Sequence, residues 1–89
     1  MPRVVFTANL QRHIPCPPCT VAGNTAREVL ENAFALAPGV RGYVVDEHGE
    51  LRHHMVVFVN GKACEDRSGL GDPVGEGDEV VVMQALSGG

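Results

Sequence analysis

The first ten residues alternate between two sets of side chains with a period of two. Val4, Phe6 and Ala8 form one set, and Val5, Thr7 and Asn9 form the other. This period is typical of a half-buried strand, which we expect to run from Arg3 to Leu10. Residues 11–18 contain three prolines and are predicted to form a loop. A short second strand is expected at Cys19–Ala22.

A helix is the clearest element of the pattern. Thr25 and Glu28 have the Thr-x-x-Glu spacing of a capping box, in which the two residues satisfy backbone N–H groups at the helix start. Apolar residues then recur at helical spacing and would form one face, which consists of Ala26, Val29, Leu30, Ala33, Leu36 and Ala37. Pro38-Gly39 is expected to end the helix.

The chain returns to a period of two after the helix. Tyr43–Val45 is a candidate strand, and Asp46–Gly49 reads as a polar turn. Met55–Val59 is predicted to be a strand, because Met55, Val57 and Val59 would share one face and Val56 and Phe58 the other. Asn60-Gly61 then predicts a tight hairpin.

A glycine-rich loop over residues 65–78 leads to the last predicted strand, from Glu79 to about Ala85. In this strand we expect Val80 and Val82 to point inward, and Val81 and Met83 to point outward. The first and last strands would pair in parallel at the centre of the sheet. One main helix packed on one mixed sheet of four to five strands is an α+β arrangement, and we expect residues 1–89 to form a single domain.

Composition narrows the class of protein. The 89 residues carry 11 acidic and 7 basic side chains, for a net charge of −4, which disfavours nucleic acid and anionic membranes as partners because both need a basic surface. No stretch is long and apolar enough to cross a bilayer, and the first residues turn polar too soon for a signal peptide. We therefore expect a cytoplasmic protein. The common nucleotide-binding, zinc-protease and nucleophile-elbow motifs are absent, so we do not expect an independent enzyme.

The sequence ends in two glycines after an apolar strand. Because glycine has no Cβ, Gly88-Gly89 would make a thin, flexible ribbon that can enter a narrow active-site channel. The terminal carboxylate of Gly89 would then be the reactive group, with its activated carbonyl open to attack. A frayed terminus is the alternative explanation, and the strand and loop before the glycines argue against it.

Three segments resemble the MoaD/ThiS family of sulfur carriers. They are Val57–Lys62, Gly75–Val80 and Ala85–Gly89. The resemblance follows the element order over nearly the whole chain, and its motifs are specific from about His53 onward. It implies a β-grasp, ubiquitin-like fold in which residues 86–89 form a flexible C-terminal tail. The stretches at 51–54 and 68–70 resemble carriers for cysteine or specialised metabolites more than the small subunit of molybdopterin synthase.

The resemblance also implies a set of partners. An adenylating enzyme of the ubiquitin-activating type would consume ATP and join AMP to the Gly89 carboxylate. A sulfur donor would then displace AMP to leave a thiocarboxylate, and a sulfur-accepting biosynthetic enzyme would use that sulfur. The carrier itself would bind no cofactor. The same adenylation step fits a protein modifier joined through Gly89 to lysines of target proteins, and the sequence does not separate these two functions.

In ubiquitin-like folds, the sheet face opposite the helix carries an apolar docking patch. The residues that match it here are Phe58, Val81 and Met83, with Leu86 at the base of the tail. A dimer contact, or hydrophobic side chains scattered over the surface, is the alternative interpretation.

One group of residues is unusual for this family. His13, Cys16 and Cys19 have a spacing that zinc ligands use, with His53 or His54 as a fourth candidate. A metal-binding module built on Cys16 and Cys19 is therefore a third hypothesis. The two prolines between the cysteines remove N–H donors that usually support thiolates, which favours a stiff loop without a metal.

Overall fold

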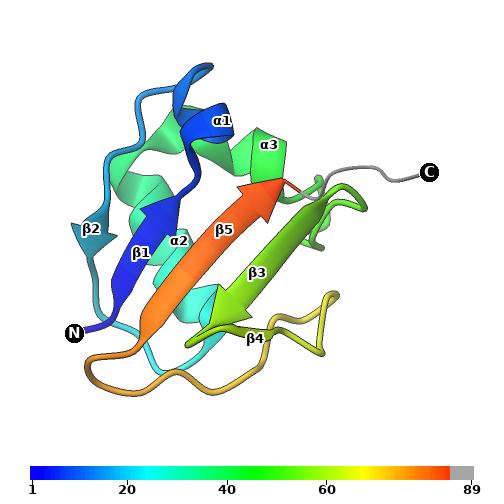
Figure 1. Cartoon of the computed structure of the whole chain (residues 1–89). Helices are drawn as coiled ribbons and strands as arrows, with labels where there is room; N and C mark the ends of the chain where they lie inside the picture. The colour runs from blue at the N-terminus through cyan, green and yellow to red at the C-terminus, as the bar shows by residue number, and fades with distance from the viewer. Residues whose placement is uncertain (85–89) are drawn as a thin grey trace.

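The computed structural model describes residues 1–84. The elements, in chain order, are β1 (Arg3–Phe6), α1 (Ala8–Gln11), β2 (Cys19–Thr20), α2 (Ala26–Leu36), the 3₁₀ turn η1 (Pro38–Val40), α3 (Arg41–Val44), β3 (Met55–Val59), β4 (Lys62–Ala63) and β5 (Glu79–Gln84). The strands form one mixed sheet in the order β2-β1-β5-β3-β4, and α2 crosses one of its faces (Figure 1). The predicted α+β class is confirmed.

The central strand of the sheet is β5. It pairs in parallel with β1 and antiparallel with β3, which confirms the predicted pairing of the first and last strands. Val4 lies opposite Val80, and Phe6 lies opposite Val82. All four side chains are buried on the face that α2 covers, and burial of such apolar area is the main stabilising contribution to a domain of this size. The strand ends beside α1 and α3 (Figure 1).

The capping box of α2 is present. The Thr25 hydroxyl accepts a hydrogen bond from the backbone N–H of Glu28 at 3.2 Å. The Glu28 carboxylate accepts one from the N–H of Asn24 at 2.8 Å, one residue before the usual partner. The helix start is therefore held in both directions, and Val29 and Leu30 are packed into the core.

The apolar face of α2 differs from the prediction at its end. Leu36 was expected to be inward and is 67% exposed, whereas Phe34 was not assigned to that face and is only 4% exposed. Leu36 is the last residue of the helix, and the chain turns directly into η1. Val40 of η1 is fully buried and provides the apolar side chain at this end of the core.

Two predicted strand segments are helical. The first strand ends at Phe6, not Leu10, and α1 follows with Leu10 still buried. Tyr43–Val45 is not a strand, because Tyr43 and Val44 belong to α3 and Val45 forms only an isolated bridge with Leu51. Val44 and Val45 are both buried, which adjacent residues of a half-buried strand cannot achieve but the end of a helix can.

The predicted turns and the strand Met55–Val59 are confirmed, whereas the second strand covers only Cys19–Thr20 of the predicted Cys19–Ala22. The last strand begins at Glu79 as predicted and runs to Gln84, and Ala85 lies outside the described residues. Asp46 accepts hydrogen bonds from the N–H groups of His48 and Glu50, as a polar turn requires. Asn60 and Gly61 both have positive φ, at 50° and 83°, which is the geometry of a type I′ hairpin turn. No helix within residues 1–84 is long and apolar enough to cross a membrane.

Candidate functional site

The sheet face opposite α2 carries side chains from β1, β5 and β3. The register places Val81 of β5 opposite both Val5 and Phe58. Residues that lie opposite one another in a sheet point to the same face, so these three side chains form a row across it. Met83 and Val56 form a second row, one step closer to the end of β5. We call these five residues the open-face patch.

The open-face patch is apolar and accessible. Met83 is 36% exposed, and the other four residues of the patch are half-buried. The alternate residues of the same strands are buried under α2, so each strand has one covered face and one open face. Polar residues bound the patch at the start of β5, where Arg3 lies opposite Glu79. An apolar patch with a polar rim on a small domain is typical of a protein-docking surface.

The structure brings together three of the four residues predicted to bind a partner. Phe58, Val81 and Met83 share the patch, whereas Leu86 lies outside the described residues. Val5 and Val56 belong to the same surface and were not selected from the sequence. The signal for both was available, since each falls on the outward side of its period-two alternation.

The strand that leads to the glycines is held on both sides up to its last described residue. Gln84 pairs with Met55 of β3. On the other side, the backbone N–H of Thr7 donates to the carbonyl of Val82 at 3.1 Å, and the side-chain amide of Asn9 donates to the side chain of Gln84. Gly88 and Gly89, the predicted reactive residues, lie outside the described residues.

The segment from His13 to Cys19 does not form a metal site. Cys16 is buried in the core and Cys19 is half-buried, and burial raises the pKa of both thiols. The thiolate is the form that binds metals, so a raised pKa disfavours ligation. The ring of the exposed His13 stacks on Tyr43 with the centroids 6.2 Å apart. Within residues 1–84 there is no group of three or more His, Cys, Asp or Glu side chains placed to hold a metal ion.

The third cysteine is also protected. Cys64 packs against the core, and burial together with the charges of Asp72 and Asp66 raises its pKa to about 11. A thiol with that pKa is protonated at neutral pH and is a poor nucleophile. We therefore find no activated thiol among the three cysteines, which leaves the open-face patch and the end of β5 as the candidate functional site.

The comparisons with known proteins agree with this architecture. The model of the ThiS family matches residues 18–89. Among solved structures, a chain of the BexX/CysO complex from Amycolatopsis orientalis is 23% identical over 100% of both chains, with a TM-score of 0.83. Small archaeal modifier protein 1 from Haloferax volcanii is 26% identical over 99% of this chain and 98% of its own, with a TM-score of 0.77.

A third structure, CysO from Mycobacterium tuberculosis, is 21% identical over 97% of this chain and 100% of its own, with a TM-score of 0.81. At these identities the likeness to both CysO structures shows the fold alone. No curated protein matches the chain at a significant level.

Proposed function

This chain belongs to the ThiS family of ubiquitin-like, β-grasp sulfur carriers, and we propose that a partner enzyme converts its Gly89 carboxylate to a thiocarboxylate that donates sulfur in biosynthesis. The observation that carries the proposal is the family match, which extends through residues 18–89 and so includes both glycines. The thiol chemistry of the described residues gives no competing reactive group, because burial raises the pKa of all three cysteines.

The proposed chemistry has two steps, and the partner performs both. An oxygen of the Gly89 carboxylate attacks the α-phosphorus of ATP, pyrophosphate leaves, and an acyl-adenylate forms. Sulfide then attacks the carbonyl carbon, AMP leaves with the electrons of the broken C–O bond, and the thiocarboxylate remains. The carrier contributes the carboxylate and a surface that each partner recognises in turn.

The position of the open-face patch supports this division of roles. Its second row, Met83 and Val56, lies next to the pair formed by Gln84 and Met55. A protein that covers the patch is therefore close to the residues that follow Gln84. Methionine and aromatic side chains are enriched at the centres of interfaces, which fits Met83 and Phe58 as docking residues.

The decisive test is the intact mass of the chain after incubation with ATP, sulfide and a ubiquitin-activating-type adenylating enzyme. We expect a gain equal to the replacement of one oxygen by one sulfur atom, mapped to Gly89. A chain that lacks Gly89 is the control and should gain nothing. An unchanged mass with an enzyme that is active on another carrier would overturn the proposal.

A protein modifier is the second candidate function. The observation that favours it is the likeness to small archaeal modifier protein 1, at 26% identity over 99% of this chain. If it is correct, tagged chain expressed in cells should appear in high-mass conjugates. Those conjugates should disappear when Gly89 is removed, and their absence from cells that contain the thiocarboxylate form would exclude this candidate.

A further inference from the structure

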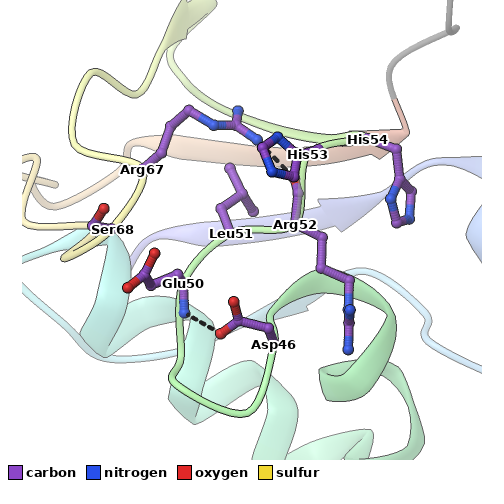
Figure 2. A pocket seen from close by; sticks show the side chains of 8 residues that line it. All are labelled: Asp46, Glu50, Leu51, Arg52, His53, His54, Arg67 and Ser68. Atoms are coloured by element: carbon purple, nitrogen blue, oxygen red, sulfur yellow. Dashed lines mark hydrogen bonds between the residues drawn. The ribbon is translucent and has the colours of Figure 1, made fainter.

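An open pocket of about 370 Å³ lies beside the start of β3. Its charged and titratable lining consists of Asp46, Glu50, Arg52, His53, His54 and Arg67 (Figure 2). The segment that carries the histidines leads directly into Met55, which pairs with Gln84 at the end of β5. The pocket therefore adjoins the end of the strand that precedes the proposed reactive tail.

The two arginines of the pocket are anchored by hydrogen bonds to backbone carbonyls. A terminal nitrogen of Arg67 donates to the carbonyl of Arg52 at 2.7 Å, and Nε of Arg52 donates to the carbonyl of Gly42 at 2.8 Å. Within residues 1–84 neither guanidinium has a carboxylate at ion-pair distance, whereas Arg41 makes two contacts with Glu31, at 3.1 and 3.2 Å. Arg67 thus has a fixed position and, as far as Gln84, N–H donors without a partner.

The acidic residues of the pocket do not accept hydrogen bonds from the N–H donors of Arg67. Both oxygen contacts of Asp46 are made within its own turn, where Oδ1 accepts from the N–H groups of His48 at 2.8 Å and Glu50 at 3.0 Å. These bonds, that from Glu50 foremost, lower the pKa of Asp46, and the charge of Arg52 makes a smaller contribution in the same direction. Figure 2 shows the Arg67 guanidinium beside the His53 ring, with the carboxylates of Asp46 and Glu50 on the opposite wall.

We propose that the Arg67–His53 wall is a socket for one Asp or Glu side chain of the adenylating partner, an inference that rests on the proposed function. A guanidinium with free donors matches a carboxylate in a two-pronged hydrogen bond. A free multivalent anion would meet repulsion from Asp46 and Glu50, whereas a carboxylate tethered to a docked protein reaches only the basic wall. The socket fixes the orientation of the partner at the base of the tail, while the open-face patch supplies apolar contact.

The test is the affinity of the adenylating enzyme for carrier variants, measured by calorimetry without ATP. Arg67→Gln should weaken binding about tenfold, which corresponds to the loss of one charge-assisted pair. Arg67→Lys should lose less, because a point charge remains. Lys62→Gln is the matched control, since it removes one positive charge at the far end of β3 and should change affinity less than twofold. Equal affinities of the Arg67→Gln and Lys62→Gln chains would overturn the socket.

Two further measurements separate this inference from its alternatives. Arg67→Glu should bind poorly and regain affinity when one acidic residue of the partner is changed to Lys, and failure of every such change would exclude a carboxylate occupant. Inorganic phosphate should not shift the amide resonances of Arg52, His53 and Arg67, and a saturable shift confined to them would assign the pocket to a free oxyanion. Failure of the proposed function would give a different result: the mass of the wild-type chain would not change after incubation with ATP, sulfide and the adenylating enzyme.

If Arg67→Gln lowers the thermal stability of the carrier, His53→Ala provides the second variant. His53 is exposed, and its side chain makes no hydrogen bond within residues 1–84. The His53→Ala variant should also bind the adenylating enzyme more weakly, with the thermal midpoint of the carrier unchanged. An affinity equal to that of the unmodified chain would place the wall outside the interface.

Discussion

Val57 and Phe58 are neighbours in β3 that face opposite sides of the sheet, and we predict that their truncation separates stability from recognition. Val57 is 0% exposed beneath α2, whereas Phe58 is half-buried in the open-face patch. Val57→Ala removes two methyl groups, which costs about 0.8 kcal/mol each in transfer free energy before the cavity contribution is added. We expect a loss of about 2 kcal/mol, or roughly 8–16 °C in thermal midpoint.

Phe58→Ala should have the opposite profile. Its cross-strand contact with Val81 is worth about 0.2–1 kcal/mol, so the thermal midpoint should fall by only a few degrees. As the aromatic residue of the patch, it is expected to contribute at least about 1.4 kcal/mol to partner binding, which is tenfold in affinity. Val57→Ala should leave that affinity unchanged at a temperature where the chain is folded.

Urea denaturation followed by circular dichroism measures the first quantity. The second is the KM for the carrier in the mass-gain assay, measured with the adenylating enzyme held constant. The reasoning is refuted if Phe58→Ala costs as much free energy of unfolding as Val57→Ala, because Phe58 would then belong to the core. An unchanged KM for Phe58→Ala would show that partners bind elsewhere.

Three other variants test separate parts of the argument. Gly88→Ala should leave the urea midpoint unchanged and abolish the mass gain, and normal sulfur transfer would contradict the need for a thin tail. Thr25→Ala removes the hydroxyl that caps α2 and should cost about 1 kcal/mol in the free energy of unfolding, with no change in KM. Hydrogen bonds from backbone N–H groups, that of Gly69 foremost, lower the pKa of Asp66 below 3.8, so its stabilising contribution is present above that pH and is lost as the pH falls through the lowered pKa. Asp66→Asn should therefore reduce the loss of stability below pH 3.8.

The sheet could be predicted from local patterns because its strands bury one face only. In β3 and β5 the alternation separates the buried Val57 and Val82 from the outward Phe58 and Met83 without any knowledge of the partner strand. The helix start was equally readable, because the capping residues lie within four positions of one another. Each of these features is encoded in a short stretch of chain.

The errors occur where the surroundings decide the conformation. Tyr43–Val45 has strand-like residues, yet a helical turn buries Val44 and Val45 together, which a strand could not do. Leu36 continues the apolar face of α2 in sequence but lies at the point where the chain leaves the helix. In both cases the deciding factor is tertiary packing, which overrides local propensity.

The candidate site divides in the same way. Phe58, Val81 and Met83 were predictable from alternation, and Val5 and Val56 follow from the same rule once the register of β5 is known. The pocket was not predictable, because Arg52 and Arg67 are fifteen positions apart and meet through a hydrogen bond between two loops. Nothing in the local sequence distinguishes these arginines from solvated surface charges.

Under the proposed function, the central position of β5 explains how the chain would bind several partners without losing its fold. Its inward side chains Val80 and Val82 are buried with β1 and α2, while no helix or strand of residues 1–84 covers its outward side chains Val81 and Met83. Stability and recognition are thus assigned to opposite faces of the same strand, and substitutions on the open face can alter partner choice at little cost in folding free energy. Because β5 is paired with β1 up to Val82 and with β3 up to Gln84, a partner that binds the following residues exerts its force on the central strand of the sheet and not on an edge strand. The same geometry predicts that amide hydrogens of β5 exchange by global unfolding and remain protected while a partner is bound.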